Sequence, residues 1–238
     1  MGEIFKLDNE LGESEKGIQH YDKILLVGEG DFSFAACLAK SFGSADNMGA
    51  TSLDSKELLM AKYSRAASNL KELEESGCTI LHEVDAHTMS QHPMLYSKSF
   101  DRIVFNFPHA GFHFNYQEHD LFLIQRHQEL VRGFLKSATN MLKENREIHV
   151  THKTAYPFNR WEIEMLGVGF GLCLVEKVPF YLWHYPRYQN KGADGSRCDE
   201  SFPVGMAYTY LPSSEFIDEF IDHILDRIVV AMLLLICF

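Results

Sequence analysis

The sequence has only five cysteines, and they are too widely scattered to suggest a shared function. They are Cys37, Cys78, Cys173, Cys198 and Cys237, and no two of them form a C-x-x-C pair. This spacing excludes a disulfide framework and a cysteine-based zinc site, and it predicts reduced thiols in an intracellular protein. The first residues are polar and lack the apolar core of a secretory signal, so we expect no signal peptide.

Positive charge is also scarce. The chain has 22 Lys and Arg against 33 Asp and Glu, which gives a formal net charge of -11. General nucleic-acid-binding proteins carry an excess of basic residues, and the chain has no dense Lys/Arg run that would direct it to the nucleus. The charge balance argues against general nucleic-acid binding. It allows a local basic surface or an accessory protein that supplies one, and it leaves cytoplasm and nucleolus open as locations.

No apolar run is long enough to span a membrane. The most apolar stretch, residues 228–238, falls well short of the roughly 20 residues that a transmembrane helix needs. We expect a buried terminal helix or an altered chain end there, and no membrane partner. The hydrophobic content of 46% and the aromatic content of 13% are those of an ordinary globular protein, so the chain can form a packed core.

What the chain does contain is an alternation of strand patterns and helical patterns. Strands are expected at residues 24–27, 49–53, 79–84, 100–105, 147–151, 172–178 and 205–210, and helices at 34–42, 57–75, 116–142 and 161–167. Strands separated by helices form a parallel sheet with right-handed crossovers. No helical pattern separates the last two strands, so we expect them to pair antiparallel at one edge. The prediction is an α/β fold, a Rossmann-like sandwich around a mostly parallel seven-stranded sheet.

The first strand runs into a glycine turn, Gly28-Glu29-Gly30-Asp31. Glycines at such a turn accept unusual backbone angles and let a ligand approach the main chain, which is typical of a nucleotide-type cofactor site. Glu29 and Asp31 would repel a phosphate, so they favour a cofactor with a cationic or hydroxyl-rich part. An NAD-dependent oxidoreductase is an alternative, although Ser33 stands where the G-x-G-x-x-G motif has its third glycine.

Three further polar signatures stand where predicted strands end: Asp54, Asp85 and the segment 106–109. Ligands of such sheets bind at the carboxyl ends of the strands, where the strand order reverses. Together with the glycine turn, these residues predict a cofactor pocket. In it, Asp54 would accept hydrogen bonds from ribose hydroxyls and Asp85 would read an adenine amino group. Each aspartate alone has a structural alternative as the cap of a following helix.

Several motifs at these positions resemble those of one protein family. They are Gly-Glu-Gly-Asp-Phe-Ser-Phe (28–34), Ala-Thr-Ser-Leu-Asp-Ser (50–55), Phe-Asp-Arg-Ile-Val-Phe-Asn-Phe-Pro-His (100–109), Ile-His-Val-Thr-His-Lys (148–153), Trp161 and Tyr-Pro-Arg-Tyr (185–188). Over roughly residues 23–210 the chain resembles the 25S ribosomal RNA uridine-N3 methyltransferase-like family, which has numerous plant members. The resemblance implies a class I methyltransferase fold, S-adenosylmethionine as cofactor and ribosomal RNA as partner, with N3 of uridine accepting the methyl group.

The resemblance also assigns roles within the predicted cofactor pocket. The turn residues Gly28, Glu29, Gly30 and Asp31 would cradle the methionine end of S-adenosylmethionine, where the acids can pair with its ammonium group. Asp54 and Asp85 keep the ribose and adenine roles that the strand ends suggested.

The segment Asn106-Phe107-Pro108-His109 resembles the Asn/Asp-Pro-Pro-aromatic loop of methyltransferases that act on planar nitrogens. In that loop an amide side chain and a main-chain carbonyl hydrogen-bond the target group, a ring such as Phe107 stacks on the base, and Pro108 stiffens the backbone. N3 of uridine carries a proton that must be removed, and His109 is the candidate general base. The alternative for His109 is a structural hydrogen bond within its own loop.

Further substrate contacts are expected from two later segments. His152 and Lys153 stand at the end of the fifth strand. Tyr185 and Arg187 belong to a segment, 181–197, that interleaves aromatic and basic residues as base-stacking and phosphate-binding loops do; packing against the sheet edge is the alternative. His149 and His152 have no carboxylate or cysteine partner at a diagnostic spacing, so we predict no metal site.

The family features end near residue 211. We therefore divide the chain into a flexible N-terminal segment (1–20), a methyltransferase-like domain (21–211) and an atypical, helical and apolar C-terminal tail (212–238). The alternative to an active enzyme is a catalytically weak or non-catalytic relative that binds RNA or protein. The sequence leaves the oligomeric state open.

Overall fold

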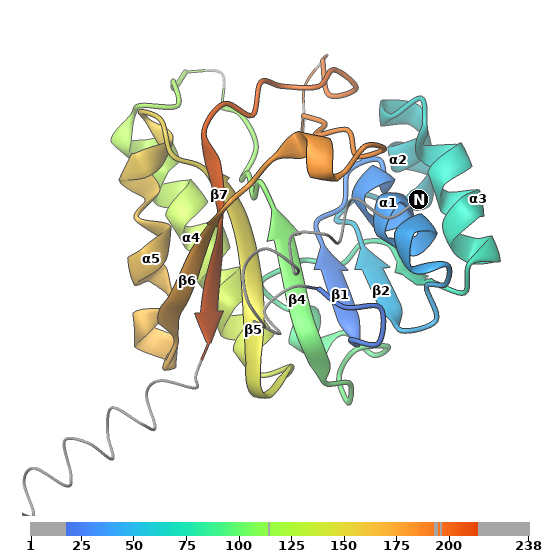
Figure 1. The fold of residues 1–238 in the computed structure, drawn as a ribbon. Helices are drawn as coiled ribbons and strands as arrows, with labels where there is room; N and C mark the ends of the chain where they lie inside the picture. The colour runs from blue at the N-terminus through green and yellow to red at the C-terminus, as the bar shows by residue number, and fades with distance from the viewer. Residues whose placement is uncertain (1–17, 114, 193–194, 196, 214–238) are drawn as a thin grey trace, which may run out of the picture.

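The fold is a seven-stranded sheet between two layers of helices (Figure 1). The computed structural model describes residues 18–213 except 114, 193–194 and 196. The predicted N-terminal segment and C-terminal tail therefore lie almost entirely outside the described residues. Within the described part of the chain, no helix is both long and apolar enough to cross a membrane.

The sheet has the strand order β3-β2-β1-β4-β5-β7-β6. Its strands are β1 (Ile24–Val27), β2 (Met48–Thr51), β3 (Thr79–Leu81), β4 (Phe100–Asn106), β5 (Leu142–Lys153), β6 (Cys173–Pro179) and β7 (Ala207–Ser213). The strands from β1 to β5 pair in parallel, whereas β7 pairs antiparallel with both β5 and β6. The predicted mostly parallel sheet with an antiparallel pair at one edge is confirmed. The last strand does not form that edge, because β7 is inserted between β5 and β6.

The central strand β1 shows how the sequence builds the two layers. Side chains alternate between the faces of a sheet, so Ile24 and Leu26 join one hydrophobic core while Leu25 and Val27 join the other. All four are at most 2% exposed, as expected of a strand covered on both faces. The first core is covered by α1 (Ser33–Phe42), α2 (Lys56–Lys62) and α3 (Ala66–Glu75), and the second by α4 (Leu121–Thr139) and α5 (Ile163–Leu166).

The pattern expected as one helix at 57–75 forms two helices, α2 and α3. Tyr63 interrupts it in an extended conformation (φ -124°) and is buried in the same core as α1. Its hydroxyl donates a hydrogen bond to the backbone oxygen of Gly192 at 2.9 Å. The interruption therefore ties the helix layer to a segment more than a hundred residues later in the chain.

The other two expected helices are shorter than predicted. The helix expected at 116–142 is α4, which ends at Thr139, and the chain from Leu142 onward already belongs to β5. The backbone of Phe100 donates a hydrogen bond to Met141 at this point, so the sheet begins where the helical pattern still continues. The helix expected at 161–167 consists of a 3-10 turn (Phe158–Trp161) followed by the single-turn α5.

Candidate active site

The glycine turn after β1 brings the main chain to the carboxyl end of the sheet. Gly28 adopts φ +69°, and a Cβ added there would collide with the ring of Phe105 on β4. Only glycine meets both demands, because the left-handed conformation strains other residues and the aromatic ring occupies the space. The main chain at 28–31 therefore lines an open cavity, the first cavity.

Asp31 offers an unused acceptor to the first cavity. The side chain is 2% exposed, and its Oδ1 accepts a hydrogen bond from the Ser33 N–H at 2.9 Å. Its Oδ2 is buried and has no hydrogen-bond partner in the described part of the chain. Burial raises the pKa of Asp31, against the opposing effect of the bonds from Ser33. A cationic group in the cavity would satisfy Oδ2, so the site fits the ammonium end of S-adenosylmethionine.

Glu29, the other acid of the turn, also lines the first cavity. Its Oε2 accepts a hydrogen bond from the Ala35 N–H at 3.2 Å. Burial raises the pKa of Glu29 to about 8, which keeps the carboxyl protonated at neutral pH. A cation brought next to it would favour the ionised form, so Glu29 and Asp31 respond to the same kind of ligand.

Asp54 and Asp85 reach the first cavity too, and each already has a partner. The Lys62 Nζ lies 3.0 Å from both carboxylate oxygens of Asp54. The Oδ1 of Asp85 accepts a hydrogen bond from the His87 N–H at 2.8 Å, which caps the turn after β3. No sequence signal pointed to Lys62, because its separation from Asp54 has no diagnostic value and only the path of α2 brings the two together.

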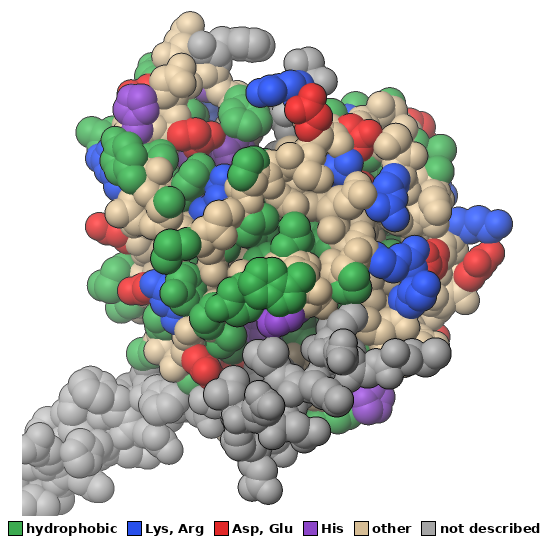
Figure 2. All heavy atoms as spheres, turned by 45° about the horizontal axis from the view of Figure 1, so that its top comes forward, with side chains coloured by type: hydrophobic (Ala, Val, Ile, Leu, Met, Phe, Trp, Pro, Cys, Tyr) green, Lys and Arg blue, Asp and Glu red, His purple; other side chains and the backbone are tan. Residues whose placement is uncertain are grey.

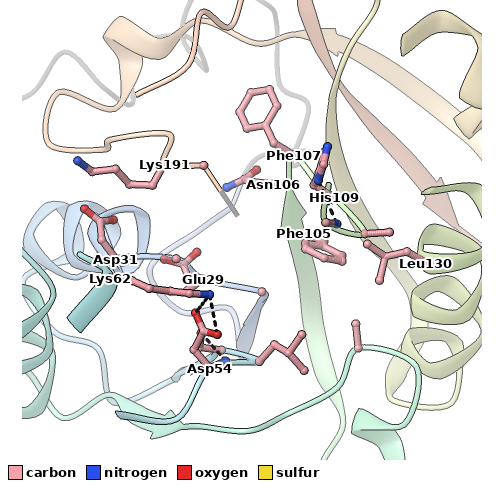
Figure 3. Close-up of a pocket in the computed structure, with 18 of the residues that line it drawn as sticks. Glu29, Asp31, Asp54, Lys62, Phe105, Asn106, Phe107, His109, Leu130 and Lys191 are labelled. Carbon is pink, nitrogen blue, oxygen red and sulfur yellow. Dashed lines mark hydrogen bonds and ion pairs between the residues drawn. The ribbon is translucent and has the colours of Figure 1, made fainter. Parts of the chain in front are cut away.

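The first cavity has a volume of about 580 Å³, which is in the range of small-molecule sites. Figure 3 shows Glu29, Asp31 and the Asp54–Lys62 pair on one side of it, and the side chains from β4 and the loop after it on the other. Lys191 lies near Asp31 at its rim. Four signatures that are separate in the sequence thus surround one cavity at the carboxyl ends of neighbouring strands.

The loop after β4 is fixed in place by Phe107. This residue has φ +48°, and its N–H donates a hydrogen bond to the Thr151 oxygen on β5 at 2.8 Å. Its ring packs edge-on against Phe180 and Phe202, with ring centres 5.4 Å apart in both cases. This loop, the partition, lies between the first cavity and a second cavity, and Lys191, Gly192 and Phe202 also line both cavities.

The four residues predicted to form the substrate loop lie on this partition. Asn106 lines the first cavity, Pro108 lines the second, and Phe107 and His109 line both. The His109 ring has two partners: its Nε2 lies 3.0 Å from Glu118 Oε1, and its Nδ1 accepts a hydrogen bond from the Gly111 N–H at 3.1 Å. Sequence reasoning did not find Glu118, which stands in the loop before α4 without any motif around it.

The second cavity also has a volume of about 580 Å³. Its walls are mainly apolar and aromatic, with Phe107, Pro108, Phe112, Phe158, Trp161, Phe202 and Pro203 among them. The Lys153 Nζ lies 4.1 Å from the ring centre of Phe158 and 4.8 Å from that of Phe202. Burial lowers the pKa of Lys153. An ammonium group held among aromatic rings suits a flat ligand with exposed oxygen atoms.

The two histidines of β5 have different surroundings. His152 lines the second cavity, its Nε2 lies 3.2 Å from the Phe158 oxygen, and its ring centre lies 4.2 Å from that of Trp161. Burial lowers the pKa of His152 to about 4, so the ring is neutral. His149 lies beside Glu147 instead, at 3.3 Å. His152 thus forms part of the wall.

Tyr185 and Arg187 line neither of the two cavities. Tyr185 packs against Phe34 and Phe180, with ring centres 5.1 and 5.4 Å apart, and burial raises its pKa to about 12. Arg187 holds the Glu72 carboxylate on α3 with two hydrogen bonds, of 2.5 and 2.6 Å. These contacts fasten the segment to the helix layer, so we leave both residues out of the proposed substrate site.

Basic side chains around the cavities are mostly paired with acids. Besides Lys62 with Asp54, Lys191 lies 2.9 Å from Asp199 and Arg197 lies 3.7 Å from Glu200. Figure 2 turns this end of the sheet toward the viewer and shows blue and red side chains next to each other, not a continuous basic surface. The charge deficit seen in the sequence therefore persists at the site.

This sheet, with a cofactor-sized cavity at the ends of its parallel strands and an antiparallel strand next to one edge, defines a class I methyltransferase fold. One solved structure, NSun6 from Pyrococcus horikoshii with SFG, matches with a TM-score of 0.51 and 16% identity, over 82% of this chain and 48% of that chain. This likeness concerns the fold alone.

The chain belongs to the BMT5-like family, described as rRNA (uridine-N3-)-methyltransferase BTM5-like, whose model matches residues 25–192. It is 55% identical over 202 residues to the uncharacterized protein At4g26485 of Arabidopsis thaliana, across 83% of this chain and 97% of that protein. It is 23% identical over 224 residues to the 25S rRNA (uridine(2634)-N(3))-methyltransferase of Saccharomyces cerevisiae, across 71% of this chain and 66% of the yeast protein. The family resemblance seen in the sequence is confirmed.

Proposed function

We propose that the protein transfers a methyl group from S-adenosylmethionine to N3 of uridine in RNA, with large-subunit ribosomal RNA as substrate. The observation that carries the proposal is a pair of adjacent cavities that share lining residues of one segment, residues 106–109. The first offers carboxylates to a cationic cofactor, and the second offers aromatic rings to a planar base. The family description and the name of the yeast relative support uridine N3 in ribosomal RNA. Such a substrate would place the protein in the nucleolus or the cytoplasm.

S-adenosylmethionine fits the polar groups of the first cavity. The free Oδ2 of Asp31 would take the ammonium of the methionine part, and the main chain at 28–31 would line this end of the cofactor site. Asp54, held by Lys62, would accept the ribose hydroxyls, and Asp85 would read the adenine amino group. When bound, the cofactor supplies an electrophilic methyl group. The remaining steps fall to the side chains of the partition and the second cavity.

The second cavity would hold the uracil ring, with Phe107 and Phe202 available for stacking. N3 of uracil lies between two carbonyl groups, so loss of its proton leaves an anion whose charge is shared with both oxygens. Lys153 would stabilise that charge, because a cation acts strongly where aromatic walls exclude water. N3 of cytosine carries no proton and forms no such anion, so Lys153 favours uracil.

Nucleoside analysis tests the proposal directly. Large-subunit ribosomal RNA transcribed in vitro is incubated with the protein and isotopically labelled S-adenosylmethionine, and its nucleosides are separated by mass. We expect labelled 3-methyluridine with the wild-type chain and a strong reduction with Asp31→Asn. Cofactor binding without any methylated nucleoside would favour the binding-module alternative, and binding of NAD in place of S-adenosylmethionine would contradict the methyltransferase assignment.

A further inference from the structure

Glu118 lies between two histidines at the base of the partition. Its Oε1 is 3.0 Å from His109 Nε2, and its Oε2 is 3.4 Å from His127 Nε2. The ligand-capable atoms of these three residues all lie within 4.8 Å of one another. Two imidazoles and one carboxylate also make up a common zinc ligand set. The cluster therefore has two possible readings, a metal site or a proton-holding unit.

The hydrogen bond at the second nitrogen of each histidine ring distinguishes a metal site from a proton-holding unit. Nδ1 of His109 faces the Gly111 N–H at 3.1 Å, and Nδ1 of His127 faces the Ala110 N–H at 3.1 Å. A backbone N–H is always a donor, so each Nδ1 must present its lone pair, and the ring proton of each neutral histidine sits on Nε2. A metal-bound Nε2 would need the opposite tautomer, in which Nδ1 carries the proton and donates it. The backbone thus orients both rings for donating to Glu118.

The electrostatics of the cluster agree with this assignment. Burial alone would raise the pKa of Glu118, but the hydrogen bond with His109 and the close approach of the His127 ring outweigh it and hold that pKa well below its usual range, so the carboxylate is charged. His127 is fully buried and stacks on Trp161, with ring centres 4.2 Å apart, and burial lowers its pKa. His127 is therefore neutral, and its Nε2 faces the carboxylate at 3.4 Å.

Other charges reach the cluster from two elements. Lys153 and the neutral His152 face it from β5, and Arg126 faces it from α4. The ammonium of Lys153 attracts the Glu118 carboxylate without a direct contact. Because the carboxylate is the negative group in direct contact with the His109 ring, it is the group that would stabilise positive charge on that ring.

We propose that Glu118 is a positioning residue that clamps His109 and His127 in the Nε2–H tautomer, which makes Nδ1 of His109 the proton acceptor. This inference rests on the proposed function. In the reaction, the N3 proton of uracil passes to Nδ1 of His109, which releases the Gly111 N–H. The electron pair left on N3 forms the bond to the methyl carbon while the methyl–sulfur bond breaks. The electron pair of the broken bond stays on sulfur. Gly111 has φ +85°, and a Cβ added there would meet nothing within 4 Å, so its peptide can turn away.

The tautomers can be measured without RNA or cofactor. Long-range proton–nitrogen NMR spectra of the full chain with ¹⁵N-labelled histidine should show Nε2–H tautomers for His109 and His127. In Glu118→Gln the amide oxygen can accept from one ring only, and the amide NH₂ faces the other as a second donor, so at least one ring should lose this signature. The control Asp120→Asn removes a half-buried charge two residues away and keeps an oxygen that can accept the hydrogen bond from the Gln117 N–H, so it should change neither ring.

Activity and zinc binding complete the test. In Glu118→Gln we expect methyl transfer to transcribed large-subunit ribosomal RNA to fall about 10²-fold, the lower end of what a general base contributes, with unchanged cofactor affinity. Asp120→Asn should match wild type. Nδ1–H tautomers, tight binding of one zinc ion per chain, or full activity of Glu118→Gln would overturn the proposal. If the wild-type chain methylates no RNA but shows the expected tautomers, the clamp stands and the proposed function fails.

Discussion

At the scale of single residues, His109 links the two cavities and has the most direct test. We expect His109→Ala to reduce methyl transfer by roughly 10²- to 10⁴-fold, the range that general-base help supplies. Cofactor affinity should not change, because the carboxylates of the first cavity stay in place. Turnover and cofactor binding are measured on the same preparation. Unchanged turnover would remove His109 from the mechanism and leave it the structural role of holding Glu118.

Glu29 makes the stability of the protein depend on pH. Burial raises its pKa from 4.5 to about 8 in the folded chain. The folded state therefore holds this proton more tightly than the unfolded state, so the contribution of Glu29 is complete below pH 4.5 and is lost as the pH rises through about 8. Urea unfolding at about pH 5 and about pH 9 should show a loss of a few kcal/mol that is absent in Glu29→Gln.

The Gln variant keeps an oxygen for the Ala35 N–H, so the comparison isolates the titration of the carboxyl group. The exposed Glu144 serves as the control, since Glu144→Gln should leave the pH profile of the wild type unchanged. Equal pH profiles for wild type and Glu29→Gln would show that Glu29 is ionised in the folded protein.

At the scale of elements, the turn between β1 and α1 depends on the absence of a side chain. Gly28 and Gly43 both have positive φ, but a Cβ at Gly28 would collide with Phe105, whereas one at Gly43 meets nothing within 4 Å. We expect Gly43→Ala to lower the free energy of unfolding by about 1 kcal/mol because of backbone strain. Gly28→Ala should lower the free energy of unfolding by roughly 1–3 kcal/mol more, because the Phe105 ring and its neighbours have to shift. The free energy of unfolding in urea measures both, and equal losses would mean that the Phe105 ring moves aside without cost.

The helix bounds show where element-scale reasoning from sequence stops. The interruption after α2 has neither glycine nor proline to announce it, and Tyr63 leaves the helix because its ring and hydroxyl find better contacts in the core and at Gly192. The end of α4 was missed for a related reason. The helical pattern continues past Thr139, but pairing of Phe100 with Leu142 takes the chain into β5. In both places a distant contact overrides a local preference.

At the scale of the whole molecule, the net charge of -11 limits how the protein could hold the RNA substrate proposed for it. Lys62, Lys191 and Arg197 are paired with acids, while Lys153 and Arg126 lie over aromatic rings. With about two free cations at the site, we expect affinity for transcribed ribosomal RNA to fall only about tenfold between 50 and 200 mM salt. Fluorescence anisotropy with a labelled RNA measures this change.

A loss of 10³- to 10⁵-fold over the same salt range would indicate six to ten phosphate contacts and contradict this expectation. A weak salt dependence together with low affinity would instead point to an accessory protein that supplies the missing positive surface. In that case an extract fraction that restores affinity should also restore a steep salt dependence.

The sequence by itself determined the order of strands and helices, the glycine turn and the polar strand ends, because these depend on neighbouring residues and on the periodicity of apolar side chains. It also carried the family motifs. It could place Asn106, Phe107, Pro108 and His109 in one loop, since they are consecutive. The two cavities that these residues line could not be predicted from the amino-acid sequence.

Only the tertiary structure decided which distant side chains meet. Packing of α4 on the sheet brings Glu118 and His127 to His109, and the path of α2 brings Lys62 to Asp54. A contact with α3 takes Arg187 away from the site by pairing it with Glu72. The physical reason is that tautomer, charge and exposure depend on contacts between elements, whereas strand and turn patterns depend on contacts within them.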